Sequence, residues 1–256
     1  MVTDLPASRT GTDGSAVVRV LSYNIRSMRD DTAALARVIR ACAPDVVCVQ
    51  EAPRFVRWRK RAAWLARHTG LVYVTGGATT AGPMVLASLR AHVEHTRDVL
   101  LPRTPGLHRR GLATAVLRFR SADRPPARLG VVSCHLSLDA GERLEQAGLL
   151  LGEADGLGTE HVVVAGDLNE GPAGPSFGRL AGRLRDGWAV GPWGTEDTFP
   201  SAGPRRRIDA LFASPGVEVL GCGVPAGLAG VSAGDLAAAT DHLPVLAAVR
   251  VPAAVA

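Results

Sequence analysis

Short polar side chains follow a buried strand at residues 161–172, HVVVAGDLNEGP. The apolar run from Val162 to Ala165 predicts the strand, and Asp167 and Asn169 come directly after it. Two residues apart on extended backbone, these side chains project to the same side, where they can hold a cation or a phosphate. Because Asp, Asn and Gly are also common turn residues, this stretch alone favours a turn.

Polar side chains also lie at the ends of other predicted strands. They belong to Asn24, Glu51, His135, Asp241 and His242. Asp209 lies inside the apolar strand RRIDALF, where a buried carboxylate is costly unless it is paired. Singly, each residue has a structural explanation, such as a turn or a carboxylate at a helix N-terminus. Together, the two His, four carboxylates and two Asn beside core strands indicate one functional site.

This set of side chains suits metal-assisted hydrolysis of a phosphoester. Mg²⁺ takes hard oxygen ligands, keeps several waters and binds through one or two carboxylates beside a substrate phosphate. We expect Glu51 to bind the ion, with Asp241 on the same ion or reached through water. A bound metal polarises a phosphoryl oxygen and neutralises charge on the leaving oxygen. The sequence has no Cys/His cluster typical of zinc.

Hydrolysis also needs a group that takes a proton from the attacking water. His242, oriented by the buried carboxylate of Asp209, is the candidate general base. Asp167 is expected to orient that water, and Asn169 to donate an N–H to a phosphate oxygen. His135 is suited to donate to a nonbridging oxygen or to assist the leaving group.

Helix signals separate several of the predicted strands. Apolar spacing of i, i+3, i+4 and i+7 predicts a helix that ends at Cys42, with Asp31 as its N-cap. A second helix is expected around residues 56–68, and Asp139 with Glu142 forms a capping-box pattern before a third.

The order of these segments predicts an α/β fold. Strands alternate with helices, then form a meander, then alternate again, which suits two mixed sheets packed face to face with helices outside. We expect a single catalytic domain over residues 16–256. The polar residues 1–15 are expected to be disordered.

The composition is that of a globular protein, with 46% hydrophobic residues among 256 and a net charge of +5. This charge favours anionic partners, but every basic residue except Lys60 is Arg in a chain rich in Ala and Gly, so the evidence for nucleic acid is weak. The cysteines are interpreted as reduced thiols in a cytoplasmic protein. We find no signal-peptide pattern, no apolar run of membrane-span length and no oligomerisation segment, and we expect a monomer.

Six segments occur in the order and approximate spacing of one known family: SYNIR, VCVQE, VSCHL, AGDLNEGP, RRIDALFAS and TDHLPV. Over residues 17–251 the chain resembles the endonuclease/exonuclease/phosphatase superfamily, whose fold is that of deoxyribonuclease I. The resemblance implies a four-layered α/β sandwich. It also implies Mg²⁺- or Mn²⁺-dependent hydrolysis of phosphoesters.

The resemblance carries over residue by residue. It matches Asn24 to an Asn that orients the site, Glu51 to the metal-binding Glu, and Asp209 to the carboxylate that pairs with the last histidine. The other matches are His135, Asp167, Asn169, Asp241 and His242. The sequence departs from the family pattern in two places. Pro83 and Met84 stand where many members have a Gly-Asn pair, and the tyrosine of some DNA-cutting members is missing or displaced. These departures bear on the substrate more than on the reaction type.

Arginines near the predicted site also bear on the substrate, because a guanidinium binds phosphate through two hydrogen bonds. The segments HRRG and PRRRID offer Arg109, Arg110 and Arg207 as candidate phosphate clamps. In residues 54–68, RFVRWRKRAAWLARH, basic and aromatic side chains interleave and can follow a nucleic-acid backbone. A solvated helix whose Trp residues pack inward is the favoured interpretation of that segment.

Three functions are compatible with the sequence. The first is a nuclease or other phosphodiesterase that hydrolyses P–O bonds by in-line attack of activated water, favoured by the net charge and the Arg placement. The second is a phosphatase or phosphodiesterase for a lipid or small-molecule phosphate, since fold does not fix substrate. The third is a catalytically inactive binding module, which the retained Glu51, histidines and GDLN acid disfavour.

Overall fold

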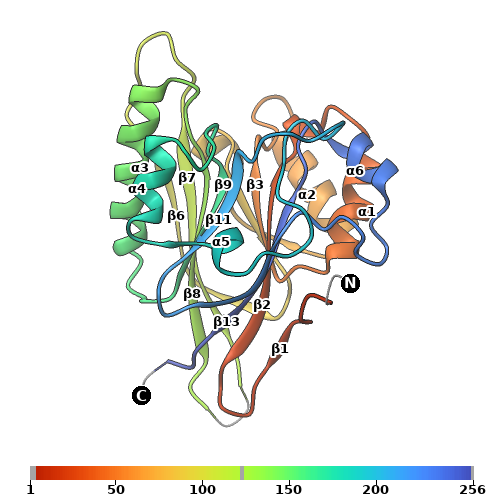
Figure 1. Cartoon of the computed structure of the whole chain (residues 1–256), viewed down its shortest axis with the longest axis vertical. Coiled ribbons are helices and arrows are strands. Elements are labelled where there is room, and N and C mark those ends of the chain that lie inside the picture. Colours follow the sequence, from red (N-terminus) through yellow and green to blue (C-terminus); the bar gives the residue numbers. More distant parts are fainter. Residues whose placement is uncertain (1–3, 122–123, 255–256) are drawn as a thin grey trace.

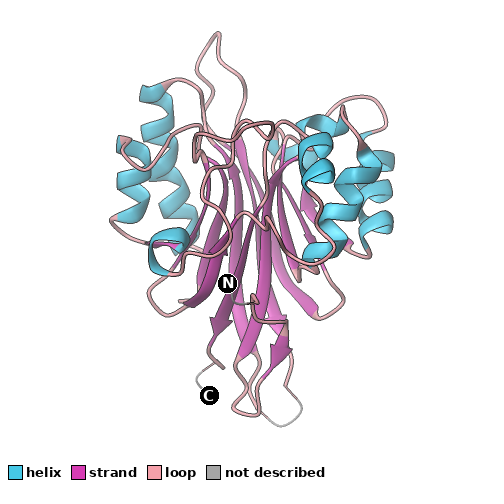
Figure 2. Ribbon diagram, turned by 45° about the vertical axis from the view of Figure 1, so that its right-hand side comes forward, coloured by secondary structure: helices cyan, strands magenta, loops and turns pink. Residues whose placement is uncertain are grey.

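The structure is a computed structural model that describes residues 4–121 and 124–254. Within those residues two β-sheets pack face to face, and helices cover the outer face of each (Figure 1). Figure 2 shows the strands gathered in the middle with helices on both sides. This is the four-layered α/β sandwich that the sequence predicts.

The first sheet contains β1 (Arg9–Thr10), β2 (Ala16–Asn24), β3 (Val46–Gln50), β4 (Val72–Gly76), β5 (Met84–Ala87), β12 (Glu218–Gly223) and β13 (Val245–Val251). Its order is β12-β13-β2-β3-β5-β4, with β1 paired to the start of β2. Its outer face is covered by α1 (Thr32–Cys42), α2 (Trp58–Thr69) and α6 (Ala233–Ala239). Two short 3-10 helices, η1 (Arg26–Met28) and η2 (Gly77–Thr80), follow β2 and β4.

The second sheet contains β6 (Ala91–Leu100), β7 (Gly111–Phe119), β8 (Ala127–His135), β9 (Val162–Asp167), β10 (Arg185–Asp186) and β11 (Asp209–Ala213). Its order is β10-β11-β9-β8-β7-β6. Its outer face is covered by α3 (Ala140–Asp155) and α4 (Pro175–Ala181), while the short α5 (Gly187–Val190) lies beside β11 and β12.

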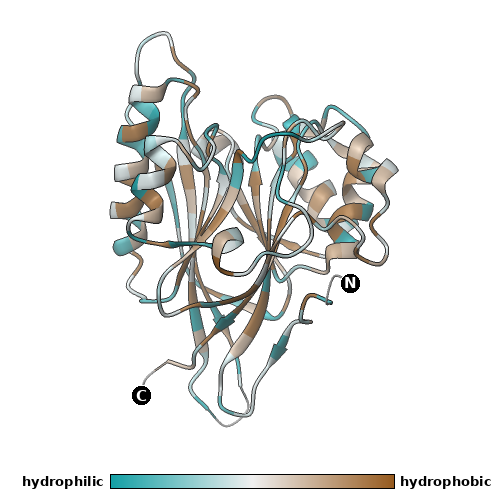
Figure 3. Cartoon of the chain, in the orientation of Figure 1, coloured by the Kyte–Doolittle hydropathy of each residue, from teal (hydrophilic) through white to brown (hydrophobic). Residues whose placement is uncertain are grey.

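Side-chain alternation along the strands divides the apolar residues among three cores. In β2, Leu21 and Tyr23 belong to the core under the helices, whereas Val18 and Val20 face the second sheet. The core between the sheets consists largely of Val and Ala, and its alanines include Ala16, Ala113, Ala115, Ala127, Ala165, Ala213 and Ala247. Figure 3 shows the strands coloured as hydrophobic over much of their length. The small side chains between them allow the sheets to pack closely.

Parallel strand pairing occurs twice among the described residues and determines where the polar residues lie. The crossover through α1 joins β2 to β3, and the crossover through α3 joins β8 to β9. The register pairs Asn24 with Gln50, and His135 with Asp167, at the carboxyl ends of these strands. Antiparallel β11 begins opposite β9, with Asp209 paired to Asp167. Polar residues from both sheets therefore lie at the same end of the sandwich.

Two of the predicted helices begin at the residues that carry the capping signals. Asp31 caps α1 by accepting hydrogen bonds from the backbone N–H groups of Ala33 and Ala34. Asp139 caps α3 by accepting from the N–H of Glu142 at 2.8 Å. The three predicted helices are therefore present, although α2 begins at Trp58 rather than near residue 56.

Two expectations from the composition concern the cysteines and membrane spans. Cys42, Cys48, Cys134 and Cys222 are buried and free of disulfide bonds, as expected for reduced thiols. In residues 4–121 and 124–254, none of the helices has the length and apolar character needed to cross a membrane.

The N-terminal segment differs from the expected disorder of residues 1–15. Leu5 is 3% exposed and packs into the core under the helices. The carbonyl oxygens of Leu5 and Pro6 accept hydrogen bonds from the guanidinium of Arg19 on β2. Because a half-buried guanidinium needs acceptors, this segment is held against the sheet. Expected disorder is therefore wrong for residues 4–15, and residues 1–3 lie outside the described residues.

We expect Leu5→Ala to lower the free energy of unfolding by about 2–3 kcal/mol, because it removes buried apolar atoms and leaves a cavity. The measurement is urea unfolding followed by circular dichroism. Leu89→Ala is the matched control, since Leu89 is 82% exposed, and it should change stability by less than about 0.5 kcal/mol. Equal stabilities for the two variants would contradict the packing of the N-terminal segment.

Candidate active site

A pocket of about 500 Å³ opens at the end of the sandwich where β2, β3, β8 and β9 finish. It is lined by six of the residues predicted from sequence: Glu51, Arg110, His135, Asp167, Asn169 and His242. Asn24 and Asp209, which are 1% and 2% exposed, lie beneath this lining and contact it through hydrogen bonds. The structure thus brings together side chains that are far apart in the sequence.

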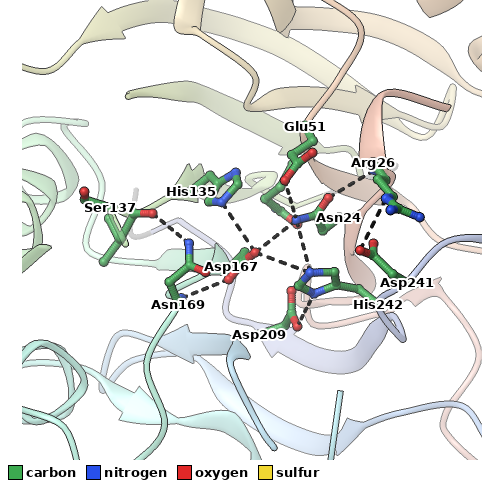
Figure 4. A network of polar contacts seen from close by, with 12 residues as sticks. Asn24, Arg26, Glu51, His135, Ser137, Asp167, Asn169, Asp209, Asp241 and His242 are labelled. Carbon is green, nitrogen blue, oxygen red and sulfur yellow. Dashed lines mark hydrogen bonds and ion pairs between the residues drawn. The ribbon is translucent and has the colours of Figure 1, made fainter. Parts of the chain in front are cut away.

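The carboxylate of Asp167 lies at the centre of the polar network (Figure 4). Its Oδ2 accepts a hydrogen bond from Asn24 Nδ2 at 2.9 Å and lies 3.5 Å from His135 Nε2 and 3.8 Å from His242 Nε2. Its Oδ1 accepts from the backbone N–H of Asn169 at 2.9 Å. A 1% exposed carboxylate is thus surrounded by donors that offset its lost hydration.

His242 is paired with Asp209 as the sequence predicts. His242 Nδ1 lies 2.9 Å from Asp209 Oδ2, which leaves Nε2 directed toward Asp167. Burial disfavours a charged imidazole, but Asp209, Asp167 and Asp241 outweigh it and raise the pKa of His242 to about 9. The ring of Phe199 packs at 4.8 Å from the imidazole. The imidazole is therefore fixed in position with one nitrogen available in the pocket.

His135 is held in a different electrostatic environment. Burial lowers its pKa to about 3, an effect that Asp167 opposes and that Arg110 and His242 reinforce. His135 is therefore a neutral imidazole in the pocket. A neutral ring can donate a hydrogen bond from one nitrogen and accept one at the other.

Asn24 connects the carboxylates of the two sheets. Its Nδ2 lies 3.3 Å from Glu51 Oε1, 2.9 Å from Asp167 Oδ2 and 3.5 Å from His242 Nε2. Its Oδ1 accepts from the backbone N–H of Arg26 at 3.1 Å, which fixes the orientation of the amide. Asn24 thus orients the site rather than lining the pocket.

Three of the pocket residues, Glu51, Ala81 and Asn169, have left-handed backbone. Glu51 has a φ of 51° and Asn169 a φ of 53°. Asn adopts this region readily, but Glu does so rarely, and such conformations persist where the surrounding structure imposes them. The turn after β3 therefore directs the carboxylate of Glu51 into the pocket, while the amide of Asn169 donates to Leu136 O at 2.9 Å.

Asp241 lies at the margin of this network. Its side chain is 36% exposed and its Oδ2 lies 3.4 Å from Nε of Arg26 (Figure 4). It does not line the pocket, and its side chain contacts Arg26 and Thr240 instead. A role of Asp241 as a metal ligand therefore stays a prediction.

The three arginines proposed as phosphate clamps have different positions. Arg110 is 8% exposed and lines the pocket, and burial lowers the pKa of its guanidinium although Asp167 and Glu51 oppose this. Arg109 is exposed and does not line the pocket. Arg207 is buried and is not among the residues that line the pocket.

The position of Arg207 corrects the sequence-based hypothesis for this residue. Its Nη1 and Nη2 donate to the two carboxylate oxygens of Asp186 at 2.9 and 2.7 Å, and its Nε lies 3.2 Å from Glu196. The guanidinium also packs over the ring of Phe177. These partners occupy the guanidinium N–H groups with which Arg207 would bind a phosphate. Arg207 is therefore a structural residue.

Sequence reasoning missed several residues that line the pocket. They are Arg29, Arg54, His108, Leu138, Phe199 and Arg206. Arg206 stacks on Phe199 at 4.8 Å, and both are brought to the pocket by an isolated antiparallel bridge between these two residues. Arg54 was noted in the sequence only as the first basic residue of the segment 54–68, and not as a residue of the catalytic pocket.

A buried ion pair connects the loops that follow β8 and β9. Nη2 of Arg143 on α3 lies 3.1 Å from Oε1 of Glu170, and their side chains are 10% and 9% exposed. Arg143 also donates to the carbonyl oxygens of Ser137 and Leu138, while Glu170 accepts from the backbone N–H of Phe177. This pair therefore holds the loops after His135 and after the GDLN segment against α3 and α4.

We expect Glu170→Ala to lower the free energy of unfolding by about 3 kcal/mol, because Arg143 would remain as an uncompensated buried charge. Asp155→Ala is the matched control, since the Arg183–Asp155 pair is 60% and 63% exposed, and its loss should cost at most about 1 kcal/mol. Denaturant unfolding of both variants measures the difference. A cost for Glu170→Ala no larger than for the control would reject this role.

Comparison with known proteins agrees with this geometry. The profile of the Endonuclease/Exonuclease/phosphatase family matches residues 21–242. A search of curated proteins found no match. Among solved structures, an endonuclease/exonuclease/phosphatase from Bacteroides vulgatus is 19% identical with a TM-score of 0.72, and the alignment covers 92% of this chain and 99% of that one.

Two further structures are similar over comparable lengths. The mannosyl-6-phosphatase of Bacteroides thetaiotaomicron is 16% identical with a TM-score of 0.71, covering 91% of this chain and 99% of that one. Truncated TDP2 of Caenorhabditis elegans is 17% identical with a TM-score of 0.65, covering 93% and 98%. At these identities the similarity establishes the fold, whereas the profile match establishes the family. The chain belongs to the Endonuclease/Exonuclease/phosphatase family.

Proposed function

We propose that this protein is a divalent-metal-dependent phosphodiesterase of the nuclease type. The observation that carries the proposal is the Asp209–His242 pair, whose free imidazole nitrogen faces Asp167 in a pocket that also contains Glu51. Family membership supports hydrolysis of phosphoesters as the reaction class. We infer a diester rather than a monoester because of the cationic lining of the pocket.

The donor set fits a hard divalent cation. Glu51 and Asp167 offer carboxylate oxygens at the pocket, and Oδ1 of the buried Asp209 has no hydrogen-bond partner. Ligand atoms of Asp167, Asp209 and His242 lie within 4.8 Å of one another. Oxygen ligands of this kind suit Mg²⁺ or Mn²⁺. When bound, such an ion would polarise a phosphoryl oxygen and neutralise charge on the leaving oxygen.

We assign Glu51 as the principal ligand of this ion. Its carboxylate is directed into the pocket by a left-handed backbone, and its Oε1 contacts the same amide nitrogen as Asp167. Asp241 is a second ligand in this proposal, reached through water, because Arg26 already neutralises it. Asn24 keeps the Glu51 and Asp167 carboxylates beside each other despite their repulsion.

The remaining pocket residues act on the substrate and on the attacking water. Asp167 orients the water, and the deprotonated form of His242 takes the proton that this water loses at Nε2 and becomes imidazolium, while Asp209 holds Nδ1. The neutral His135 donates to a nonbridging oxygen. Asn169 has one amide N–H on Leu136 O, and its second N–H is available for a phosphate oxygen.

Cationic side chains around the pocket favour an extended anionic substrate. Arg110 is the candidate phosphate clamp, and Arg29, Arg54 and Arg206 lie on the same lining. Guanidinium groups bind phosphate oxygens in bidentate fashion. Several cations around a single scissile phosphate suit a substrate that carries neighbouring phosphates, which supports nucleic acid over an isolated phosphomonoester.

Hydrolysis of bis-p-nitrophenyl phosphate in the presence of Mg²⁺ or Mn²⁺ tests this proposal. We expect His242→Ala to lower kcat by roughly 10²–10⁴-fold, because it removes the positioned proton-transfer group. His92→Ala is the matched control, since His92 is exposed on β6. Wild-type turnover that survives His242→Ala would rule out the assigned role.

Metal binding has its own test, with a readout separate from turnover. We expect Glu51→Gln to weaken Mn²⁺ binding by at least about 10-fold in isothermal titration calorimetry, because it removes a charged oxygen ligand. Glu145→Gln on the exposed surface of α3 is the control. Equal affinities in the wild type and Glu51→Gln would exclude Glu51 as the ligand.

The alternative of a lipid or small-molecule phosphatase predicts another pattern of substrates. It requires turnover of p-nitrophenyl phosphate or of the small diester while supercoiled plasmid and single-stranded DNA stay intact. Cleavage of DNA that EDTA and His242→Ala both abolish supports the nuclease. Absence of turnover with any of these substrates and metals would favour the inactive binding module.

A further inference from the structure

The segment of residues 54–68 keeps two of its aromatic side chains at the surface, beside the active-site pocket. Trp64 is partly buried, packs on the core under the helices and stacks on His68 with ring centroids 4.0 Å apart. Inward packing therefore explains Trp64. Phe55, in contrast, is 79% exposed, and Trp58 lines a surface hollow.

The start of α2 carries a concentration of positive charge without acidic partners. Arg57, Arg59, Lys60 and Arg61 are exposed, and none of them forms an ion pair among the described residues. The first turn of the helix has no acidic residue. Cations at a helix N-terminus oppose the helix dipole, so this arrangement destabilises the free protein. An anion bound there would reduce the repulsion among these cations and would interact favourably with the helix dipole.

A hollow of about 300 Å³ with aromatic walls lies next to these charges. It is lined by Trp58, Arg59, Ala62, Ala63, Tyr73 and Thr79. The indole of Trp58 packs against Gly77, where an added Cβ would lie 3.2 Å from the ring, and the Arg59 guanidinium lies over that indole at 4.4 Å. The hydroxyl of Tyr73 donates to Gly76 O at 2.9 Å. Both rings are thus held in place by the turn after β4.

A carboxylate beside this hollow, that of Asp98, is already engaged. Asp98 on β6 accepts hydrogen bonds from the hydroxyls of Thr75 and Thr79. Burial and the negative charge of Asp98 raise the pKa of the Tyr73 phenol, and Arg59 opposes this shift. The cations at the start of α2 therefore exceed the acidic groups around the hollow.

The hollow lies close to the catalytic pocket, because Thr79 lines the hollow and Ala81, two residues later, lines the pocket. Arg54 lines that pocket, donates to Ala81 O at 3.0 Å, and lies with its guanidinium 5.8 Å from the ring of Phe55. The turn that carries Arg54 lies between the end of β3 and the start of α2, so it joins the pocket to the helix (Figure 1). Cations and aromatic rings therefore alternate from the pocket outward.

The geometry points to a docking site for single-stranded nucleic acid, formed by Arg54, Phe55, Arg57, Trp58, Arg59 and Tyr73, which we name the α2 rim. A base would take the place of the Arg59 guanidinium on the indole of Trp58 or stack on Phe55, while the arginines contact the phosphates that lead to the active-site pocket. Single strands are favoured because their bases are free to stack on aromatic side chains. This inference rests on the proposed phosphodiesterase function.

A membrane surface is the competing partner, because Phe55 and Val56 are 79% and 87% exposed beside basic residues. Two protruding side chains bury little apolar surface, and even one acyl chain gives only marginal membrane binding. The fixed, flat rings of the hollow suit a planar base rather than a lipid chain. The structure therefore favours nucleic acid.

Fluorescence anisotropy of a labelled oligonucleotide of about 12 nucleotides, recorded in EDTA so that it stays uncleaved, tests the α2 rim. We expect Trp58→Ala to weaken binding about 5- to 100-fold, in the range of one lost base stack, and Trp58→Phe to restore most of it. Arg59→Glu should weaken binding and reduce its salt dependence. Arg67→Glu is the matched control, because Arg67 is exposed in the last turn of the same helix.

Each outcome decides between the alternatives. Equal effects of Arg59→Glu and Arg67→Glu would overturn the α2 rim. So would an affinity for duplex DNA that equals the affinity for the single strand and is unchanged by Trp58→Ala. Binding to vesicles with anionic lipid, lost in the Phe55→Ala/Val56→Ala variant and without oligonucleotide binding, would assign the surface to membranes. Hydrolysis of the small diester by the wild type reports on the proposed function separately, since it needs no contact with α2.

Discussion

The structure depends on one hydrogen bond between its two sheets, from Asn24 Nδ2 to Asp167 Oδ2 at 2.9 Å. Asn24 ends a strand of the first sheet, Asp167 ends a strand of the second, and each is 1% exposed. A carboxylate so far from water is tolerated only with donors around it. The two sheets must therefore present their strand ends to each other in a fixed register. The interactions that satisfy the buried polar groups are the same ones that assemble the pocket.

Much of this arrangement could be predicted from the sequence, because buried strands leave continuous apolar runs whose ends are easily located. The resemblance to a known family added the matches of individual site residues to their roles. Asp209 was informative by itself, since a charge inside an apolar strand needs a partner, and that partner is His242. Helix caps such as Asp31 and Asp139 were predicted for the same reason, because orphan N–H groups need local acceptors.

Other features could not be predicted because they depend on tertiary contacts. Arg206 and Arg207 are adjacent in sequence, yet the bridge between Phe199 and Arg206 directs only the first toward the pocket. The segment around Leu5 is polar and shows no helix or strand periodicity. It is held in place because its carbonyl oxygens accept hydrogen bonds from the guanidinium of Arg19. The pairing of Asp241 with Arg26 follows from a left-handed turn after β2 that no sequence signal marks.

The alanine-rich layer between the sheets gives the molecule a further property. Ala16, Ala127 and Ala213 lie in that layer, at the ends of β2, β8 and β11 that are far from the pocket, and their small side chains set how closely the sheets approach. A bulkier residue at any of them would act as a wedge, and the resulting displacement would reach the strand ends where the catalytic groups meet. Substitutions that change the volume of this core would thus alter the catalytic geometry from a distance. Conversely, a ligand that bridges both sheets at the pocket would stiffen the whole sandwich.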